Sequence, residues 1–397
     1  LISAYLQRDF SYAFPQQQRH LIAIILRKLL ASSTPAVIAT LESIRKRLQA
    51  MVDEQTLDED WLSNFITEDD LDEELLEEID IVEGETTPVD MDLLNAEIAE
   101  IDTYLELARQ IHEDEKSFAL LTAIEQGFAR MFEMGASRKA VIFTESRRTQ
   151  DYLMEFLQAN GFGGKVIAFN GTNSSTVNTG IYQKWLAKYI GSDRVTGSPA
   201  IDRRTALIDA FRNEADVLIA TEAAAEGVNL QFCSLVINYD LPWNPQRVEQ
   251  RIGRCHRYGQ AFDVVVVNVL NERHDADQRV LELLTEKFAL LDGVVGPSNQ
   301  ILGTIESGID FEQRIAQIYD QCRTPEEIEA NFAKLREDLQ NQINQKMQET
   351  RELLLKHFDA DIHDLLKIQK QRAEEQLDRI SQFFWTITQA MLAPFAS

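Results

Sequence analysis

The chain has 397 residues, 44% of them hydrophobic, which is enough for two or three domains with buried cores. It contains no run of about 18 uncharged apolar residues, so no membrane-spanning helix or signal peptide is predicted. The net charge of −26 alone would argue against nucleic-acid binding, but the acidic residues are concentrated in one segment. Between Asp53 and Ala108 there are 22 Asp and Glu and no Lys or Arg, so the charge of the rest of the chain is nearly balanced.

Cysteine usage and the first residue give two further expectations. Cys233, Cys255 and Cys322 are far apart and odd in number, which argues against a disulfide framework and against a zinc site. We therefore expect a reducing compartment, the cytoplasm. The sequence begins at Leu1 rather than at a methionine, so we expect it to be a piece of a longer protein.

Residues 1–52 are predicted to be a helical lead-in, and residues 53–114 an acidic helical segment. Apolar residues recur at helical spacing over Gln18–Leu30 and Pro35–Leu48, a pattern that an ordinary helical subdomain would also show. The acidic segment repeats it on both sides of the turn Glu83–Pro88. Two amphipathic helices explain this segment. The alternative is an acidic arm that competes with nucleic acid for basic surfaces.

Residues 115–300 alternate between short apolar runs and helical patterns, which predicts an α/β domain. Five β-rich runs are separated by three helical segments; the runs are Ala140–Phe143, Val166–Phe169, Val217–Ala220, Leu235–Tyr239 and Val264–Val269, and the helices are Arg148–Asn160, Arg203–Asn213 and Gln246–His256. Nearly continuous apolar strands of this kind form a parallel sheet that is covered on both faces. Asn173–Ser198, rich in small polar residues, is predicted to be an inserted loop with a short helix at Tyr182–Tyr189.

Residues 301–397 are predicted to be helical and coiled-coil-like. A capping box at Thr324–Glu327 opens one long helix, and a second runs over Asp361–Phe384. We favour an antiparallel hairpin that packs within the chain over a dimer seam, and other subunits are candidate partners for this region. His274–Asp277 is interpreted as a loop that caps a helix, so no metal site is predicted.

The stretch Gln250–Gln260 carries the residues most suggestive of chemistry. Arg254 and Arg257 are three residues apart and would share one face of a helix whose first turn contains Pro245. A permanently charged, planar guanidinium is suited to neutralising the charge that develops on a γ-phosphate. A basic surface helix in ion pairs would show the same pattern.

This stretch resembles motif VI of superfamily 2 helicases, and its ending, His256–Gln260, resembles the Swi/Snf branch of DNA translocases. Ile219–Gln231 resembles motif V, Val141–Glu145 motif IV, and Phe169–Thr172 the short motif that follows it. The resemblance covers about residues 115–295. It implies an α/β, RecA-like parallel sheet lobe with a helical amino-terminal region and a carboxyl-terminal helical hairpin or coiled coil. Ala224–Ala225 stands where the common Swi/Snf motif V has two glycines, a form closer to the bacterial branch that includes the RNA-polymerase-recycling translocase.

The resemblance also implies roles for individual residues, which follow the carboxyl ends of the predicted strands as one site would require. Arg254 and Arg257 would reach ATP held by another lobe. The nucleotide cleft would be lined by Glu226, Gly227 and Asn229, and Gln250 would bind there and couple the cleft to DNA. Backbone phosphates of one DNA strand would be met by Ser146, Arg147, Thr172 and Thr221.

The sequence lacks the phosphate-binding loop Gly-x-x-x-x-Gly-Lys-[Ser/Thr]. ATP and Mg²⁺ would therefore be bound mainly by a first RecA-like lobe absent from this chain, and the chain alone is predicted to be inactive. The leading hypothesis is the carboxyl-terminal half of an ATP-dependent double-stranded DNA translocase or helicase. An RNA-directed superfamily 2 helicase lobe and a non-catalytic RecA-like interaction module are the alternatives.

Overall fold

A computed structural model describes seven continuous stretches and several single positions of the chain. The stretches are 32–53, 90–111, 114–221, 227–242, 245–256, 261–270 and 327–338, and the remaining positions are 5, 8, 11–13, 25, 28, 29, 278, 281, 282, 314, 315, 317, 318, 322, 341, 345 and 348. The chain divides into two compact units, Leu1–Asn299 with Glu306–Phe332 and Gln300–Ile305 with Ala333–Ser397. The predicted domain boundaries at residues 52, 114 and 300 stay predictions.

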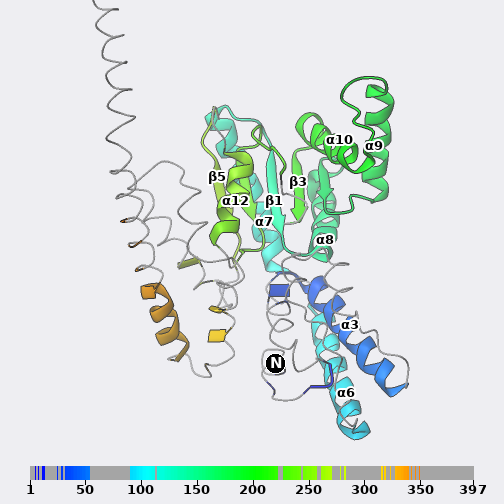
Figure 1. Ribbon diagram of the computed structural model, residues 1–397, viewed down its shortest axis with the longest axis vertical. Helices are drawn as coiled ribbons and strands as arrows, with labels where there is room; N and C mark the ends of the chain where they lie inside the picture. Colours follow the sequence, from blue (N-terminus) through cyan, green and yellow to red (C-terminus); the bar gives the residue numbers. More distant parts are fainter. Residues whose placement is uncertain are drawn as a thin grey trace, which may run out of the picture. The chain divides into compact units, whose positions relative to one another are not determined.

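Two helices in the first unit, α3 (Thr34–Val52) and α6 (Met91–Arg109), pack against each other (Figure 1). Each helix begins at a capping side chain that accepts hydrogen bonds from amides of the first turn. Ser33 accepts from the Ala36 amide, and Asp90 accepts from the Asp92 and Leu93 amides. The predicted helices at Pro35–Leu48 and in the second half of the acidic segment are thereby confirmed. Most of Gln18–Leu30 and the first half of the acidic segment lie outside the described residues.

The predicted lead-in and acidic segments share one hydrophobic core. Its members come from α3, from α6 and from positions before α3, and they include Tyr5, Ile25, Leu29, Leu41, Ile44, Leu48, Leu94, Ile101 and Leu105. At the edge of this core the carboxylate of Glu97 is buried, and it accepts hydrogen bonds from the Tyr5 hydroxyl at 2.6 Å and the Tyr12 amide at 2.9 Å. Buried carboxylates need such donors, so Glu97 fixes where the first residues of the chain meet α6.

The centre of the unit is a five-stranded sheet in the order β2-β3-β1-β4-β5, with every neighbouring pair parallel. The strands are β1 (Ala140–Thr144), β2 (Val166–Phe169), β3 (Val217–Thr221), β4 (Leu235–Asn238) and β5 (Val265–Asn268). Every residue of β1 to β4 is buried. The predicted α/β fold with a RecA-like parallel sheet is confirmed.

Helices cover both faces of this sheet (Figure 1). Alternate strand residues such as Ile142 and Ile219 pack against α7 (Glu115–Met134) and α8 (Arg147–Leu157), which is followed by the short π-helix η1 (Gln158–Phe162). Their neighbours, including Val141, Phe143 and Leu218, point to the other face and pack against α10 (Pro199–Asn213) and the end of α12 (Pro245–Cys255). This two-sided burial explains why the strands are nearly continuous apolar runs in the sequence.

The inserted segment differs from its prediction as a loop. It forms helix α9 (Thr176–Tyr189), which begins six residues before the predicted short helix. Ser175 caps this helix by accepting from the Asn178 amide at 3.2 Å, and the buried Asn178 side chain donates to the Ala168 carbonyl at 2.9 Å. The small polar residues therefore begin and anchor a helix rather than prevent one.

Little of the carboxyl-terminal region is described. Residues 327–338 are helical, as the stripe of apolar residues there predicts, whereas the capping box before them and the second helix of the hairpin lie outside the described residues. The coiled-coil hairpin stays a prediction. No helix in the described part of the chain is long and apolar enough to cross a membrane.

Gly127, in the buried face of α7, gives a test of how closely α7 approaches the sheet. A Cβ atom at this position would clash with the Cδ2 atom of Leu235, and Leu235 is fully buried. We expect Gly127→Val to lower the free energy of unfolding by about 1–3 kcal/mol through overpacking. Gly180→Val in α9, where a Cβ meets nothing within 4 Å, is the control and should change it little. Equal urea midpoints for the two variants would contradict this packing.

Candidate nucleotide and nucleic-acid site at the carboxyl edge of the sheet

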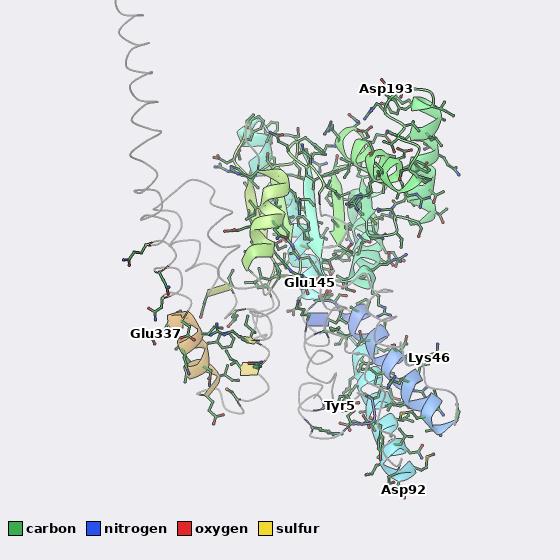
Figure 2. All side chains as sticks on the ribbon, viewed as in Figure 1. Tyr5, Lys46, Asp92, Glu145, Asp193 and Glu337 are labelled. Carbon is green, nitrogen blue, oxygen red and sulfur yellow. The ribbon has the colours of Figure 1, made fainter. Side chains whose placement is uncertain are left out.

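The parallel register brings the carboxyl ends of β1 and β3 together. Thr144 is paired with Thr221, and both side chains are buried. Glu145, labelled in Figure 2, follows β1 and leads directly into Ser146 and Arg147 at the start of α8. Three of the four residues predicted to contact DNA therefore lie at the ends of two neighbouring strands.

The hydroxyl group of Ser146 has a local structural role. It is the N-cap of α8 and accepts from the Thr149 amide at 3.4 Å, and it is fully buried. Arg147 is half-buried in the first turn of the same helix. Burial raises the pKa of the nearby Asp151 carboxyl, and the positive charge of Arg147 opposes that rise. Of the two residues, only Arg147 offers an accessible group for a phosphate.

Thr172 is exposed in a tight polar turn after β2. The Asn170 amide donates to Asn173 Oδ1 at 3.0 Å, and the Asn173 amide donates back to Asn170 Oδ1 at 2.7 Å. The sequence analysis missed the residue that holds this turn, Gln150 of α8. Gln150 Nε2 donates to the carbonyls of Phe169 and Ile219, and Gln150 Oε1 accepts from Asn170 at 2.8 Å. One buried amide thus links the end of β2, the middle of β3 and the turn after β2.

Helix α12 presents the residues predicted for the nucleotide. Gln250 is exposed and Arg254 half-buried, whereas Arg251 between them is 1% exposed and points into the lobe. The Leu230 amide donates to the Arg254 carbonyl at 2.9 Å, so the end of α12 lies directly beside Asn229. Asn229 is exposed, and its side chain accepts from the Gln231 amide at 3.0 Å. Two of the predicted nucleotide-contacting residues are therefore adjacent.

Three other predicted residues have different outcomes. Gly227 is exposed and has a φ of +72°, a left-handed conformation that favours glycine, which accounts for the residue type without reference to a ligand. Glu226 and Arg257 lie outside the described residues. Among the residues that the structure describes, no three His, Cys, Asp or Glu side chains are placed to hold a metal ion.

Among the described residues at this edge, the side chain with the most polar partners is Asp240, which lies two residues after the end of β4. Its Oδ2 atom accepts from the Thr144 hydroxyl at 2.6 Å, the Ser32 hydroxyl at 2.8 Å and the Glu145 amide at 3.0 Å. Its Oδ1 atom accepts from Lys116 Nζ at 2.9 Å, in an ion pair whose side chains are 10% and 8% exposed. Asp240 therefore joins α7, β1 and the residues before α3.

The ionisation of Asp240 follows from these contacts. Burial alone would raise the pKa of its carboxyl, but Lys116 and the donors on Thr144 and Glu145 outweigh burial, and the pKa lies below its ordinary value. The folded protein therefore holds Asp240 as a carboxylate. Its contribution to stability is present above the unfolded pKa, near 3.9, and is lost as the pH falls below that value.

We expect Asp240→Asn to lower the free energy of unfolding by roughly 3 kcal/mol at pH 7, because Lys116 would be left as a buried charge without its partner. Between about pH 5 and pH 3 the wild type should lose stability faster than the variant, as the wild-type carboxylate becomes protonated. Urea unfolding at both pH values measures this. Asp216→Asn, which breaks a more exposed pair with Arg138, is the control and should cost less than about 1 kcal/mol. Equal losses in the two variants would contradict the role of Asp240.

Part of this region is similar in sequence to known proteins. Residues 148–259 match the helicase conserved C-terminal domain, a range that begins at the second residue of α8 and includes β2, β3, β4 and α12. The uncharacterized ATP-dependent helicase YqhH of Bacillus subtilis is 40% identical over 197 residues, which are 50% of this chain and 30% of YqhH. Helicase SWR1 of Gibberella zeae is 30% identical over 169 residues, which are 42% of this chain and 8% of SWR1.

Among solved structures, a crystal structure of the C-terminal part of the Fun30 ATPase domain matches with a TM-score of 0.33 and 18% identity, covering 79% of this chain and 83% of that one. The fold assignment rests on the parallel sheet itself. The chain spans less than a third of the length of either sequence relative. The resemblance to Swi/Snf-type helicases is confirmed: residues 148–259 match the helicase conserved C-terminal domain, and 50% and 42% of the chain are similar to the ATP-dependent helicase YqhH and to helicase SWR1.

Proposed function

We propose that this chain is the second motor lobe of an ATP-dependent double-stranded DNA translocase. The observation that carries the proposal is the gathering of Arg147, Thr172 and α12 along the carboxyl edge of one parallel sheet, where Thr172 and α12 lie inside the matched helicase C-terminal domain and Arg147 directly precedes it. Ligands of open α/β sheets bind at this edge. A first RecA-like lobe of the same longer protein would face it.

In this proposal α12 supplies positive charge to ATP held by the first lobe. Arg254 is the described arginine on the accessible side of the helix, and Asn229 and Gln250 lie exposed beside it. A guanidinium at the γ-phosphate stabilises the charge that develops as the phosphoryl group is transferred. Mg²⁺ would be bound mainly by the first lobe together with ATP, because this sequence has no phosphate-binding loop. Arg257 and Glu226 complete the proposed set.

Nucleic acid would lie along the same edge. Thr172 is exposed there, and Arg147 provides a guanidinium, which is an ordinary phosphate partner. Contact through the Ser146 or Thr221 hydroxyl would require those buried groups to become accessible, so we assign the first contacts to Arg147 and Thr172. Duplex DNA is proposed as the substrate because the His256–Gln260 ending resembles that of Swi/Snf-type translocases.

The proposal extends to the compartment of the protein and to its protein partners. The three cysteines are free and buried, which supports a reducing compartment such as the cytoplasm. The helical region after residue 300 is proposed as a contact for other protein subunits.

The test measures, by fluorescence anisotropy across a salt series, the affinity of this chain for a labelled 20-base-pair DNA duplex and for an RNA duplex of the same sequence. We expect preference for DNA, and a plot of log affinity against log salt whose slope falls by roughly 0.9 in Arg147→Gln, since one phosphate contact is lost. Thr172→Ala should weaken binding without changing the slope.

The matched controls lie on α7. Arg130→Gln and Thr122→Ala change exposed residues of the same types, and Arg130 lies in the half of α7 that leads to the opposite edge of the sheet. These two variants should bind as the wild type does. Tighter binding to RNA would favour the RNA-directed helicase instead, and no binding to either duplex would favour the interaction module.

ATP turnover tests the role of Arg254. We expect no hydrolysis by this chain alone, and DNA-stimulated hydrolysis once it is joined to a first lobe. In that longer protein Arg254→Ala should lower kcat by roughly 10³-fold with little change in ATP binding, as arginine fingers do elsewhere. Arg212→Ala, an exposed arginine on α10, is the control. A loss below about tenfold, which is about 1.4 kcal/mol, would make Arg254 a structural residue.

A further inference from the structure

Asp240 lies between the two halves of the proposed site and contacts each of them with a different group. Its carboxylate binds the end of β1, and its backbone carbonyl binds α12. The residue itself is 7% exposed. The motif resemblance assigns it no role, and the proposed function does not use it.

On the carboxylate side, Asp240 holds the chain that leads into the proposed DNA contact. Thr144 and Glu145, the two residues before Ser146, both donate to Oδ2. The Ser32 hydroxyl donates to the same oxygen and lies 2.7 Å from the Thr149 hydroxyl in the first turn of α8. The turn that presents Arg147 is therefore held on both sides by groups attached to Asp240.

On the carbonyl side, Asp240 holds the helix that carries Arg254. Arg251 Nη1 donates to the Asp240 carbonyl at 2.8 Å and to Asn238 Oδ1 at 3.0 Å. The Arg251 guanidinium also lies 5.1 Å from the centre of the Phe143 ring, on β1. Arg251 is fully buried and precedes Arg254 by three residues on a rigid helix, so the position of Arg254 depends on where Arg251 is held.

We propose that Asp240 is a positioning residue that links the DNA-contacting end of β1 to the α12 helix, so that displacement of either one displaces the other. The proposal rests on the proposed function for what the two ends bind, but the linkage itself is a property of this chain. Short hydrogen bonds to both the side chain and the backbone of one buried residue leave few ways to move β1 and α12 independently.

Two backbone amides report the two ends of the linkage. The Glu145 amide donates to Asp240 Oδ2 at 3.0 Å and reports the DNA-contacting end. The Leu230 amide donates to the Arg254 carbonyl at 2.9 Å and reports the position of α12. Hydrogen exchange of these amides, resolved by NMR in the whole 397-residue chain, therefore reads each end without DNA or ATP.

The experiment changes one end and measures the other. Thr144→Val removes one donor to Asp240 at β1, and we expect exchange of the Leu230 amide to rise at least threefold. Arg251→Met releases α12, and we expect exchange of the Glu145 amide to rise by a similar factor. The Thr179 amide of α9, bonded to the Ser175 carbonyl, should be unchanged in both variants. Asp216→Asn, at the opposite edge of the sheet, should move neither reporter.

The outcomes separate a positioning role from general stabilisation. A rise at the distant reporter with no change at Thr179 supports the linkage, whether or not the near reporter also rises. Equal rises at Leu230, Glu145 and Thr179 show only a loss of stability and overturn it. No rise at the distant reporter also overturns it. Should Arg251→Met fail to fold, the milder Thr144→Val still decides the question. DNA binding by the wild type is measured in parallel, so a failure of the proposed DNA substrate is seen separately from a failure of the linkage.

Discussion

A buried ion pair between Lys116 and Asp240 constrains how this unit is built. Both side chains are about nine-tenths buried, so neither charge can be solvated, and each needs close polar partners. The partners come from the hydroxyls of Ser32 and Thr144 and the amide of Glu145. As a result, the ends of β1 and β4 and the start of α7 must lie close together at the carboxyl edge of the sheet. The same requirement draws the residues before α3 to the carboxyl edge of the sheet.

Much of this fold could be predicted from the sequence because the sheet is buried on both faces. Such strands are almost wholly apolar, so all five were predicted, and each predicted end lies within one residue of the observed end. Helix α9 was shortened in the prediction because only Asn178 and Trp185 of its residues are buried, and its periodicity is correspondingly weak. Its start depends on Ser175 and on the bond from Asn178 to the Ala168 carbonyl, a contact between residues ten apart. Small polar residues alone do not reveal that contact.

The site was only partly predictable, for a different reason. Arg254, Asn229 and Thr172 lie in recognisable motifs, whereas Gln150 and Asp240 act through partners that are distant in sequence; Ser32 and Asp240, for example, are 208 residues apart. A single sequence contains no information on such pairs. Arg251 lies inside the motif stretch, three residues before Arg254, and the sequence analysis gave it no role. Three residues advance a helix by about 300°, so the two side chains point in directions about 60° apart. That difference is enough to bury Arg251 and leave Arg254 half-buried.

The net charge of −26 does not exclude a phosphate ligand, because the binding of a phosphate depends mainly on the charges nearest the site. On α6, Glu100 and Asp102 are paired with Arg8 and Arg45, and Arg109 of α6 is paired with Glu42 of α3. These exposed pairs add little stability, yet they neutralise part of the acidic segment where it packs. At physiological salt, charges more than about 8 Å away are largely screened. A phosphate at the carboxyl edge would therefore respond mainly to charges within this distance, and the acidic segment would affect its binding only where that segment lies equally close.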